Sequence, residues 1–145
     1  MVTIRAENWQ SLLIAGNDFY QSCKWQEAEE QYDLAFALLM EECQKSPTSC
    51  EVLMAWICTC HNLSSLFESQ NKLPAAMRYL LLPHEHCKYI VAEHSASEEA
   101  KSLAIQAMSV TLPPIVEFSN NHPHLTERNQ LVNQASSLRT DNSIH

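Results

Sequence analysis

The chain contains a single glycine, Gly16, among its 145 residues. Glycine is the default residue of tight hairpin turns, β-bulges and phosphate-binding loops, because it adopts positive φ angles without steric cost. A chain with so little glycine is a poor candidate for a sheet protein or for a nucleotide-binding loop. Apolar residues recur instead at steps of three and four, which is the period of a helix. The sequence therefore predicts an all-α fold of five to six helices.

Positive charge is also scarce, with 9 Lys and Arg against 17 Asp and Glu, a formal net charge of -8 and a pI near 5.2. Nucleic acids and anionic membranes are bound through cationic patches. This acidic composition argues against both partners. It favours a protein or peptide partner whose surface is neutral or basic.

Long hydrophobic runs are missing. One long uncharged run, residues 102–116, contains Gln106 and two prolines and is too short to span a bilayer. Arg5 and Glu7 precede any apolar run, so no secretory signal is predicted. The six cysteines lie mostly within helical patterns, where they are expected to be reduced packing residues. Together these features predict a cytoplasmic protein.

Motifs for catalysis or cofactor binding are lacking: there is no phosphate loop, nucleophile elbow or HExxH. We therefore expect neither an enzyme nor a cofactor. Cys58 with His61, and His84 with Cys87, are i,i+3 pairs, but neither has a strong metal-binding spacing. Packing cysteines and solvated histidines are expected there, with no metal.

One acidic run is either a solvated helix face or a docking patch for a basic partner: Glu27, Glu29, Glu30, Asp33, Glu41 and Glu42.

Four helices are predicted in the first two thirds of the chain. They run from Thr3 or Ile4 to Ser22, from Lys24 to Lys45, from a capping box at Thr48 to Ser69, and from Leu73 to Ala92. Proline at the first turn of the fourth helix is tolerated. Pro83 lies inside that helix and is expected to kink or restart it.

A fifth helix is predicted from a capping box at Ser95 to about Leu112, where Pro113 and Pro114 end or bend it. A short final turn would then pack against the core. Residues 125–138 are predicted to form a weak closing helix, and the last seven residues are expected to be disordered. The predicted organisation is one helical domain over residues 1–125 and a polar C-terminal tail over 126–145.

The first two predicted helices resemble a tetratricopeptide repeat (TPR), a helix-turn-helix unit of about 34 residues. The signature positions are occupied by Leu12, Ala15, Gly16 and Phe19 in the first helix and by Trp25, Ala28, Tyr32 and Ala35 in the second. A second, degenerate repeat shows Leu63, Ser64, Phe67, Leu73, Ala76 and Leu80, offset by 48 residues. The resemblance implies stacked antiparallel hairpins in which Gly16 and Ala28 allow close helix packing.

The resemblance further implies an interaction module, an adaptor that binds a protein or extended peptide in a groove between the first and third helices. Its groove positions correspond to Gln10, Leu13, Asn17, Tyr20, Gln21, Cys58, His61, Ser65 and Glu68. The subclass that grips a C-terminal carboxylate has Lys where this chain has Leu13, so such tails are not expected ligands. Whether the groove or the acidic face binds the partner stays open.

Three alternatives accompany this interpretation. The chain is also similar to small acidic bacterial secretion chaperones, which cover an apolar segment of a client. The segment after His61 faintly resembles that of histidine phosphotransfer bundles, although Ser64 and Ser65 stand where that family has a Lys and a small residue. Finally, leftover apolar residues such as Ile115, Val116 and Phe118 would pack against a second copy in a homodimer.

Overall fold

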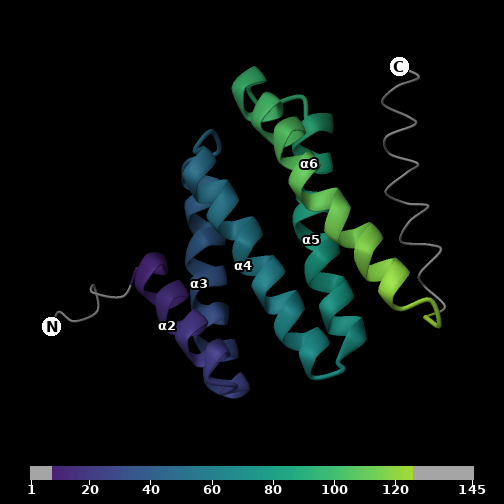
Figure 1. The fold of residues 1–145 in the computed structure, drawn as a ribbon. Helices are drawn as coiled ribbons and strands as arrows, with labels where there is room; N and C mark the ends of the chain where they lie inside the picture. The colour runs from purple at the N-terminus through teal and green to yellow at the C-terminus, as the bar shows by residue number, and fades with distance from the viewer. Residues whose placement is uncertain (1–7, 126–145) are drawn as a thin grey trace, which may run out of the picture.

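The computed structural model describes residues 8–125, which form five helices and no strands. The helices are α2 (Trp9–Gln21), α3 (Trp25–Lys45), α4 (Cys50–Ser69), α5 (Leu73–Ala92) and α6 (Glu98–Asn121). Each helix packs mainly against the next one along the chain, so the array runs from α2 to α6 in sequence order (Figure 1). The predicted all-α fold of antiparallel hairpins is confirmed. The predicted tail, residues 126–145, lies outside the described residues.

Helix α2 begins later than the sequence predicted. Asn8 has an extended backbone and its side chain accepts a hydrogen bond of 2.8 Å from the Ser11 N–H, which makes Asn8 the N-cap. The expected start at Thr3 or Ile4 is therefore wrong, because a helix cannot continue through the extended Asn8. The predicted second helix agrees with α3 to within one residue.

Helices α2 and α3 approach closely at Gly16. A Cβ atom added there would lie 2.6 Å from Cε1 of Tyr32, closer than real Cβ contacts. The neighbour is thus the Tyr32 ring, one turn beyond the expected Ala28. The Tyr32 hydroxyl donates a 2.6 Å hydrogen bond to Asn17 Oδ1, which holds the ring across Gly16.

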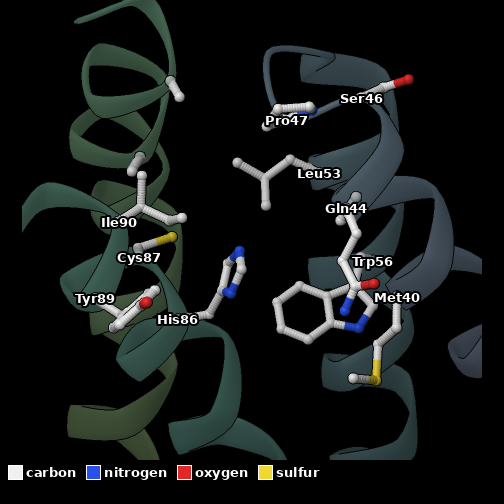
Figure 2. A pocket seen from close by; sticks show the side chains of 13 residues that line it. Met40, Gln44, Ser46, Pro47, Leu53, Trp56, His86, Cys87, Tyr89 and Ile90 are labelled. Carbon is white, nitrogen blue, oxygen red and sulfur yellow. The ribbon is translucent and has the colours of Figure 1, made fainter. Parts of the chain in front are cut away.

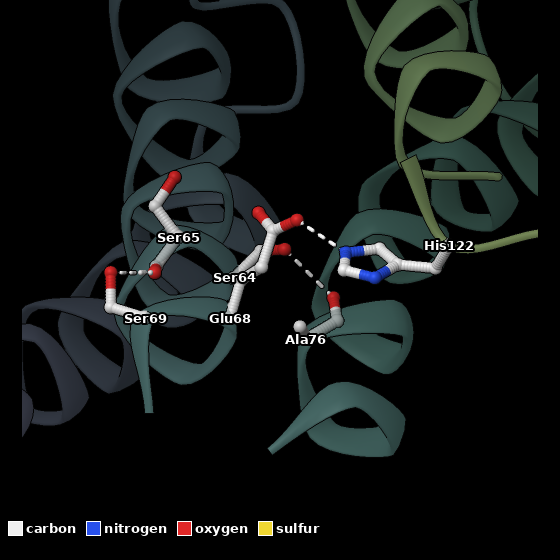
Figure 3. Close-up of polar contacts among 6 residues, drawn as sticks. All are labelled: Ser64, Ser65, Glu68, Ser69, Ala76 and His122. Carbon is white, nitrogen blue, oxygen red and sulfur yellow. Dashed lines mark hydrogen bonds and ion pairs between the residues drawn. The ribbon is translucent and has the colours of Figure 1, made fainter. Parts of the chain in front are cut away.

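The second hairpin, α4 and α5, repeats the turn of the first. Cys23 and Asn71 both have φ of 60°, and their positions differ by 71 − 23 = 48 residues. The N–H of the residue after each, Lys24 or Lys72, donates to a phenylalanine carbonyl five residues earlier, at 2.9 and 2.8 Å. Where the first hairpin has Gly16, the second has Ser64, whose buried hydroxyl donates to the Ala76 carbonyl at 2.8 Å (Figure 3). The backbone conformation and the hydrogen bond of the turn therefore recur after 48 residues, the same offset as between the two sequence segments.

Two helix caps lie one or two residues after the predicted ones. Ser49, not Thr48, caps α4 by accepting from the Val52 N–H, and Ser97, not Ser95, caps α6 by accepting from the Ala100 N–H. Serine and threonine are similar caps. The sequence therefore identified these helix starts only to within a turn.

Prolines interrupt neither α5 nor α6. Pro83 is buried within continuous α5, and α6 runs through Pro113 and Pro114 to Asn121. Of the predicted alternatives, a restart at Pro83 and an end near Leu112 are wrong, whereas a kink or bend at these prolines stays a prediction. Each proline leaves the carbonyl four residues earlier without its helical donor. In α6 these carbonyls belong to exposed Ser109 and Val110, where water can bind them.

The extended α6 buries part of the face that the sequence assigned to a homodimer. Ile115 and Phe118 are 1 and 3 % exposed and belong to the core between α3, α4 and α5. Only Val116, at 37 %, faces outward. Ile115 and Phe118 thus pack against the core, as expected for the predicted final turn, and are not free for a second copy; the homodimer itself stays a prediction.

The core forms two clusters along the array. One gathers around Tyr32, Leu63 and Phe67, and the other around Leu39, Trp56 and Ile57. The second cluster reaches α5, where the Trp56 and His86 rings meet edge to face with centroids 5.1 Å apart (Figure 2). None of the described helices is long and apolar enough to cross a membrane.

Candidate functional site

Most of the predicted groove residues border cavities between the alternate helices α2, α4 and α6. Two cavities lie there. The first, about 320 Å³, is lined by Asn17, Tyr20, Gln21, Tyr32, Asn62 and Ser65. The second, about 310 Å³, is lined by His61, Ser64, Ser65, Glu68, Leu80, Pro114, Glu117, Phe118 and Asn121. Because Ser65 borders both, we treat them as one feature and call it the α2–α4–α6 groove.

Six of the nine predicted residues line this groove: Asn17, Tyr20, Gln21, His61, Ser65 and Glu68. Gln10, Leu13 and Cys58 line neither cavity. Leu13 packs against the core, whereas Gln10 and Cys58 are exposed further along the helices. The structure thus brings together the residues nearest the two turns and leaves out those farther from them.

The floor of the groove comes from equivalent positions of the two hairpins. Tyr32 of α3 lies under the first cavity and Leu80 of α5 under the second, again 48 residues apart. Burial, and next the neighbouring Tyr20, raise the pKa of Tyr32 to about 12. The Tyr32 hydroxyl therefore stays protonated and donates to Asn17, which leaves the Asn17 amide N–H free to point to a ligand.

Polar contacts order the second cavity. The Nε2 atom of His122, just after α6, lies 2.6 Å from Oε2 of the Glu68 carboxylate. Ser69 Oγ donates a 3.0 Å hydrogen bond to the Ser65 carbonyl (Figure 3). Tyr20 and Ser69 hydroxyls are 3.3 Å apart across α2 and α4. These contacts join three helices at the groove, so its walls are held in place without a ligand.

The groove is acidic and rich in amides. Its lining includes the carboxylates of Glu68 and Glu117 and the amides of Asn17, Gln21, Asn62 and Asn121, but no lysine or arginine. Amides offer both donors and acceptors. The groove can therefore bond a polar chain and favours positive charge near its second cavity.

Sequence reasoning missed the α6 wall of the groove. Glu117 and Asn121 lie four residues apart on one helix face, but the helix was expected to end before them. Tyr32 and Asn62 were missed as well, since Tyr32 was assigned only to packing. The i,i+3 and i,i+4 spacing of Pro114, Glu117 and Asn121 was the signal that could have revealed this wall.

The His/Cys pairs do not form a metal site within residues 8–125, where no group of three or more His, Cys, Asp or Glu side chains converges. His84 is buried rather than solvated, and its Nδ1 lies 2.8 Å from Thr111 Oγ1 on α6. His61 borders the groove, but its Nε2 is buried and has no partner among the described residues. The ring as a whole is only partly buried, so the phosphotransfer alternative stays a prediction.

A further cavity, which the sequence did not indicate, lies at the N-terminal half of α4, near Leu53 and Trp56, whereas the groove lies along the C-terminal half. This further cavity occupies about 450 Å³ between the C-terminal part of α3, the start of α4, and α5 with α6 (Figure 2). It shares no lining residue with the α2–α4–α6 groove. Its walls are mainly apolar, in contrast to the groove.

Comparison with known proteins adds a family but no function. The profile of a family described as "Protein of unknown function (DUF2753)" matches residues 7–145. No curated protein and no solved structure matches the chain.

Proposed function

The chain belongs to the DUF2753 family, whose function is unknown, and we propose that it is a TPR-like interaction module that binds an extended, basic peptide segment of another protein in the α2–α4–α6 groove. The observation that carries the proposal is the convergence of six polar side chains, predicted from the resemblance, on one preorganised groove. No catalytic step is part of the proposal.

The chemistry of the lining supports a peptide ligand. An extended peptide carries unpaired backbone N–H and C=O groups along its length, and each needs a partner when it leaves water. Asn17, Gln21 and Asn62 offer such partners in the first cavity. A groove lined by side chains that are already held by hydrogen bonds loses less entropy on binding than a mobile surface does.

The charges support a basic segment. Glu68 and Glu117 border the second cavity, no cation lines the groove, and the chain as a whole has a formal charge of -8. Complementary charge increases the rate of association and disfavours acidic partners. The same polar lining favours this ligand over the apolar client of a secretion chaperone.

The test is selection of random peptides displayed on phage, followed by affinity measurements on synthetic peptides. We expect enrichment of peptides rich in lysine and arginine. Ser65→Trp places a large ring where the two cavities meet and should weaken binding by about tenfold or more, roughly 1.4 kcal/mol. Leu34→Trp, on the exposed surface of α3, is the matched control and should leave the affinity unchanged.

Two outcomes would count against the proposal. One is a failure to enrich any peptide. The other is a set of enriched peptides that binds the Ser65→Trp variant as tightly as the parent, which would place the binding surface elsewhere, for example on the acidic face of α3.

A further inference from the structure

The cavity at the N-terminal half of α4 has the size of a small-molecule site. Its volume of about 450 Å³ falls in the range of ligand pockets, roughly 300–1,000 Å³. Its lining includes Trp56, Cys87, Ala100 and Ala104, all of which are buried, while Tyr89 at the rim is 62 % exposed. The cavity therefore leads from the surface into the core and is more than a shallow apolar patch.

The lining carries no formal charge. No Asp, Glu, Lys or Arg borders the cavity, although the chain contains 26 such residues, 9 basic and 17 acidic. Burial, and next Glu42, raise the pKa of the Cys43 thiol to about 11, and burial, then Cys43, raises the pKa of Cys87 to about 11. Burial lowers the pKa of His86. These side chains are therefore neutral at pH 7, and the cavity offers no partner for an ionic ligand.

One buried donor in the wall has no acceptor. Trp56 is 3 % exposed, and its Nε1–H has no hydrogen-bond partner in residues 8–125. A buried N–H without a partner costs about 1–3 kcal/mol. Figure 2 shows the benzene ring of Trp56 directed toward His86, with the nitrogen on the side where Met40 and Gln44 line the cavity.

The walls suit a flat aromatic ring. Trp56 and His86 pack edge to face with an interplanar angle of 69°. Met40, Cys43 and Cys87 also line the cavity, and sulfur contacts aromatic rings favourably. The small side chains of Ala100 and Ala104 from α6 leave the space between them and Trp56 open.

We propose that this cavity binds a small, uncharged aromatic molecule that carries a hydrogen-bond acceptor, which Trp56 Nε1–H engages. The site is separate from the α2–α4–α6 groove and does not depend on the proposed peptide-binding function. Its occupant is a soluble compound rather than a protein segment, because the uncharged lining, which reaches into the core, matches the size and polarity of a ligand pocket.

The test uses prodan, an uncharged naphthalene whose ketone is an acceptor and whose emission moves to the blue when it leaves water. Titration of the full chain should give saturable binding with this shift. Ala104→Leu fills the cavity from α6 and should weaken binding at least tenfold. Ser65→Trp, in the groove, is the control and should bind prodan like the parent.

The acceptor is tested in two ways. Trp56→Phe keeps an aromatic ring but removes the donor, and it should weaken prodan binding about fivefold. Independently of that variant's folding, 2-dimethylaminonaphthalene, which lacks the ketone, should bind the parent chain more weakly than prodan by a similar factor. The anionic 1-anilinonaphthalene-8-sulfonate should also bind more weakly, because the cavity has no cation.

The proposal is overturned if prodan shows no saturable binding or binds the Ala104→Leu variant as tightly as the parent. Equal affinity for the ketone-free compound would remove the role of Trp56. Equal or tighter binding of the sulfonate would overturn the choice of an uncharged ligand.

Discussion

At the residue scale, Gly16 lies directly against a large aromatic ring on the next helix. Gly16 faces the Tyr32 ring, and a Cβ there would lie 2.6 Å from it. The ring cannot easily turn away, because its hydroxyl is bonded to Asn17. Gly16 is thus required by the tertiary structure, although glycine costs a helix roughly 1 kcal/mol relative to alanine.

We therefore expect Gly16→Leu to lower stability. The gain in helix propensity of roughly 1 kcal/mol should be outweighed by overpacking of about 1–3 kcal/mol. Urea melts measure the difference. Tyr32→Ala removes the ring. The double variant Gly16→Leu with Tyr32→Ala should therefore lose less stability than the sum of the losses of the two single variants. Additive losses would mean that the two residues do not clash.

The Cys23 backbone provides a second test at this scale. Cys23 has φ of 60°, a conformation that costs most L-residues about 1–2 kcal/mol but that glycine adopts freely and asparagine tolerates. We expect Cys23→Gly and Cys23→Asn each to raise stability by up to about 1 kcal/mol. Asn71, in the matching turn, already has the favourable residue, so Asn71→Cys should be destabilising. Stability changes in the opposite directions would contradict the assigned turn.

Buried histidines predict a pH dependence of stability. Burial lowers the pKa of His61, His84 and His86 below the ordinary value of 6.5. Below about pH 6.5 the unfolded chain therefore binds more protons than the folded one, and stability falls as the pH decreases. Each histidine contributes at most about 1.4 kcal/mol per pH unit.

Urea melts between about pH 5 and pH 7 check this. His84→Gln should reduce the slope of stability against pH, even though it also removes the contact with Thr111 and lowers stability at every pH. His94→Gln, at an exposed position, is the control. A slope that His84→Gln leaves unchanged would show that His84 does not titrate differently in the folded chain.

At the element scale, α6 has the greatest effect on the site. Its passage through Pro113 and Pro114 carries Ile115 and Phe118 into the core and places Glu117 and Asn121 at the groove. Had the helix ended near Leu112, the second cavity would lack one wall.

The adjacent pair Ile115 and Val116 tests this continuation. Ile115→Ala should cost about 2–5 kcal/mol, because the side chain is 1 % exposed. Val116→Ala, at a position that is 37 % exposed, should cost less than about 1 kcal/mol. Similar costs for the two substitutions in urea melts would contradict the helical register after the prolines.

At the scale of the whole molecule, the array presents two chemically different cavities at opposite halves of α4. One is polar and acidic, and the other is apolar and uncharged. Because they share no lining residue, substitutions in one should act on that one alone, as expected of distant independent sites.

We therefore expect each substitution to weaken the binding of one ligand only. Ser65→Trp should lower the affinity for the selected peptides and leave the affinity for prodan unchanged. Ala104→Leu should lower the affinity for prodan and leave the affinity for the peptides unchanged. Fluorescence titrations with both ligands on both variants measure this. If either variant lowers the affinity for both ligands while its thermal unfolding matches that of the parent, the two cavities are coupled through α4.

The sequence by itself determined the helical class, the approximate bounds of α3, α4 and α5, and the 48-residue repeat. These follow from local information: apolar periodicity, capping residues, and the small residues at Gly16 and Ser64. Six residues expected at a groove from the repeat register line the two cavities, and their role in binding stays a prediction. Only the tertiary structure decided whether prolines end α6, because hydration of freed carbonyls and burial of Ile115 and Phe118 offset the lost hydrogen bonds. It alone placed Trp56 and His86, 30 residues apart (86 − 56), in one cavity wall, since helix packing brings distant residues together in a way that local periodicity does not encode.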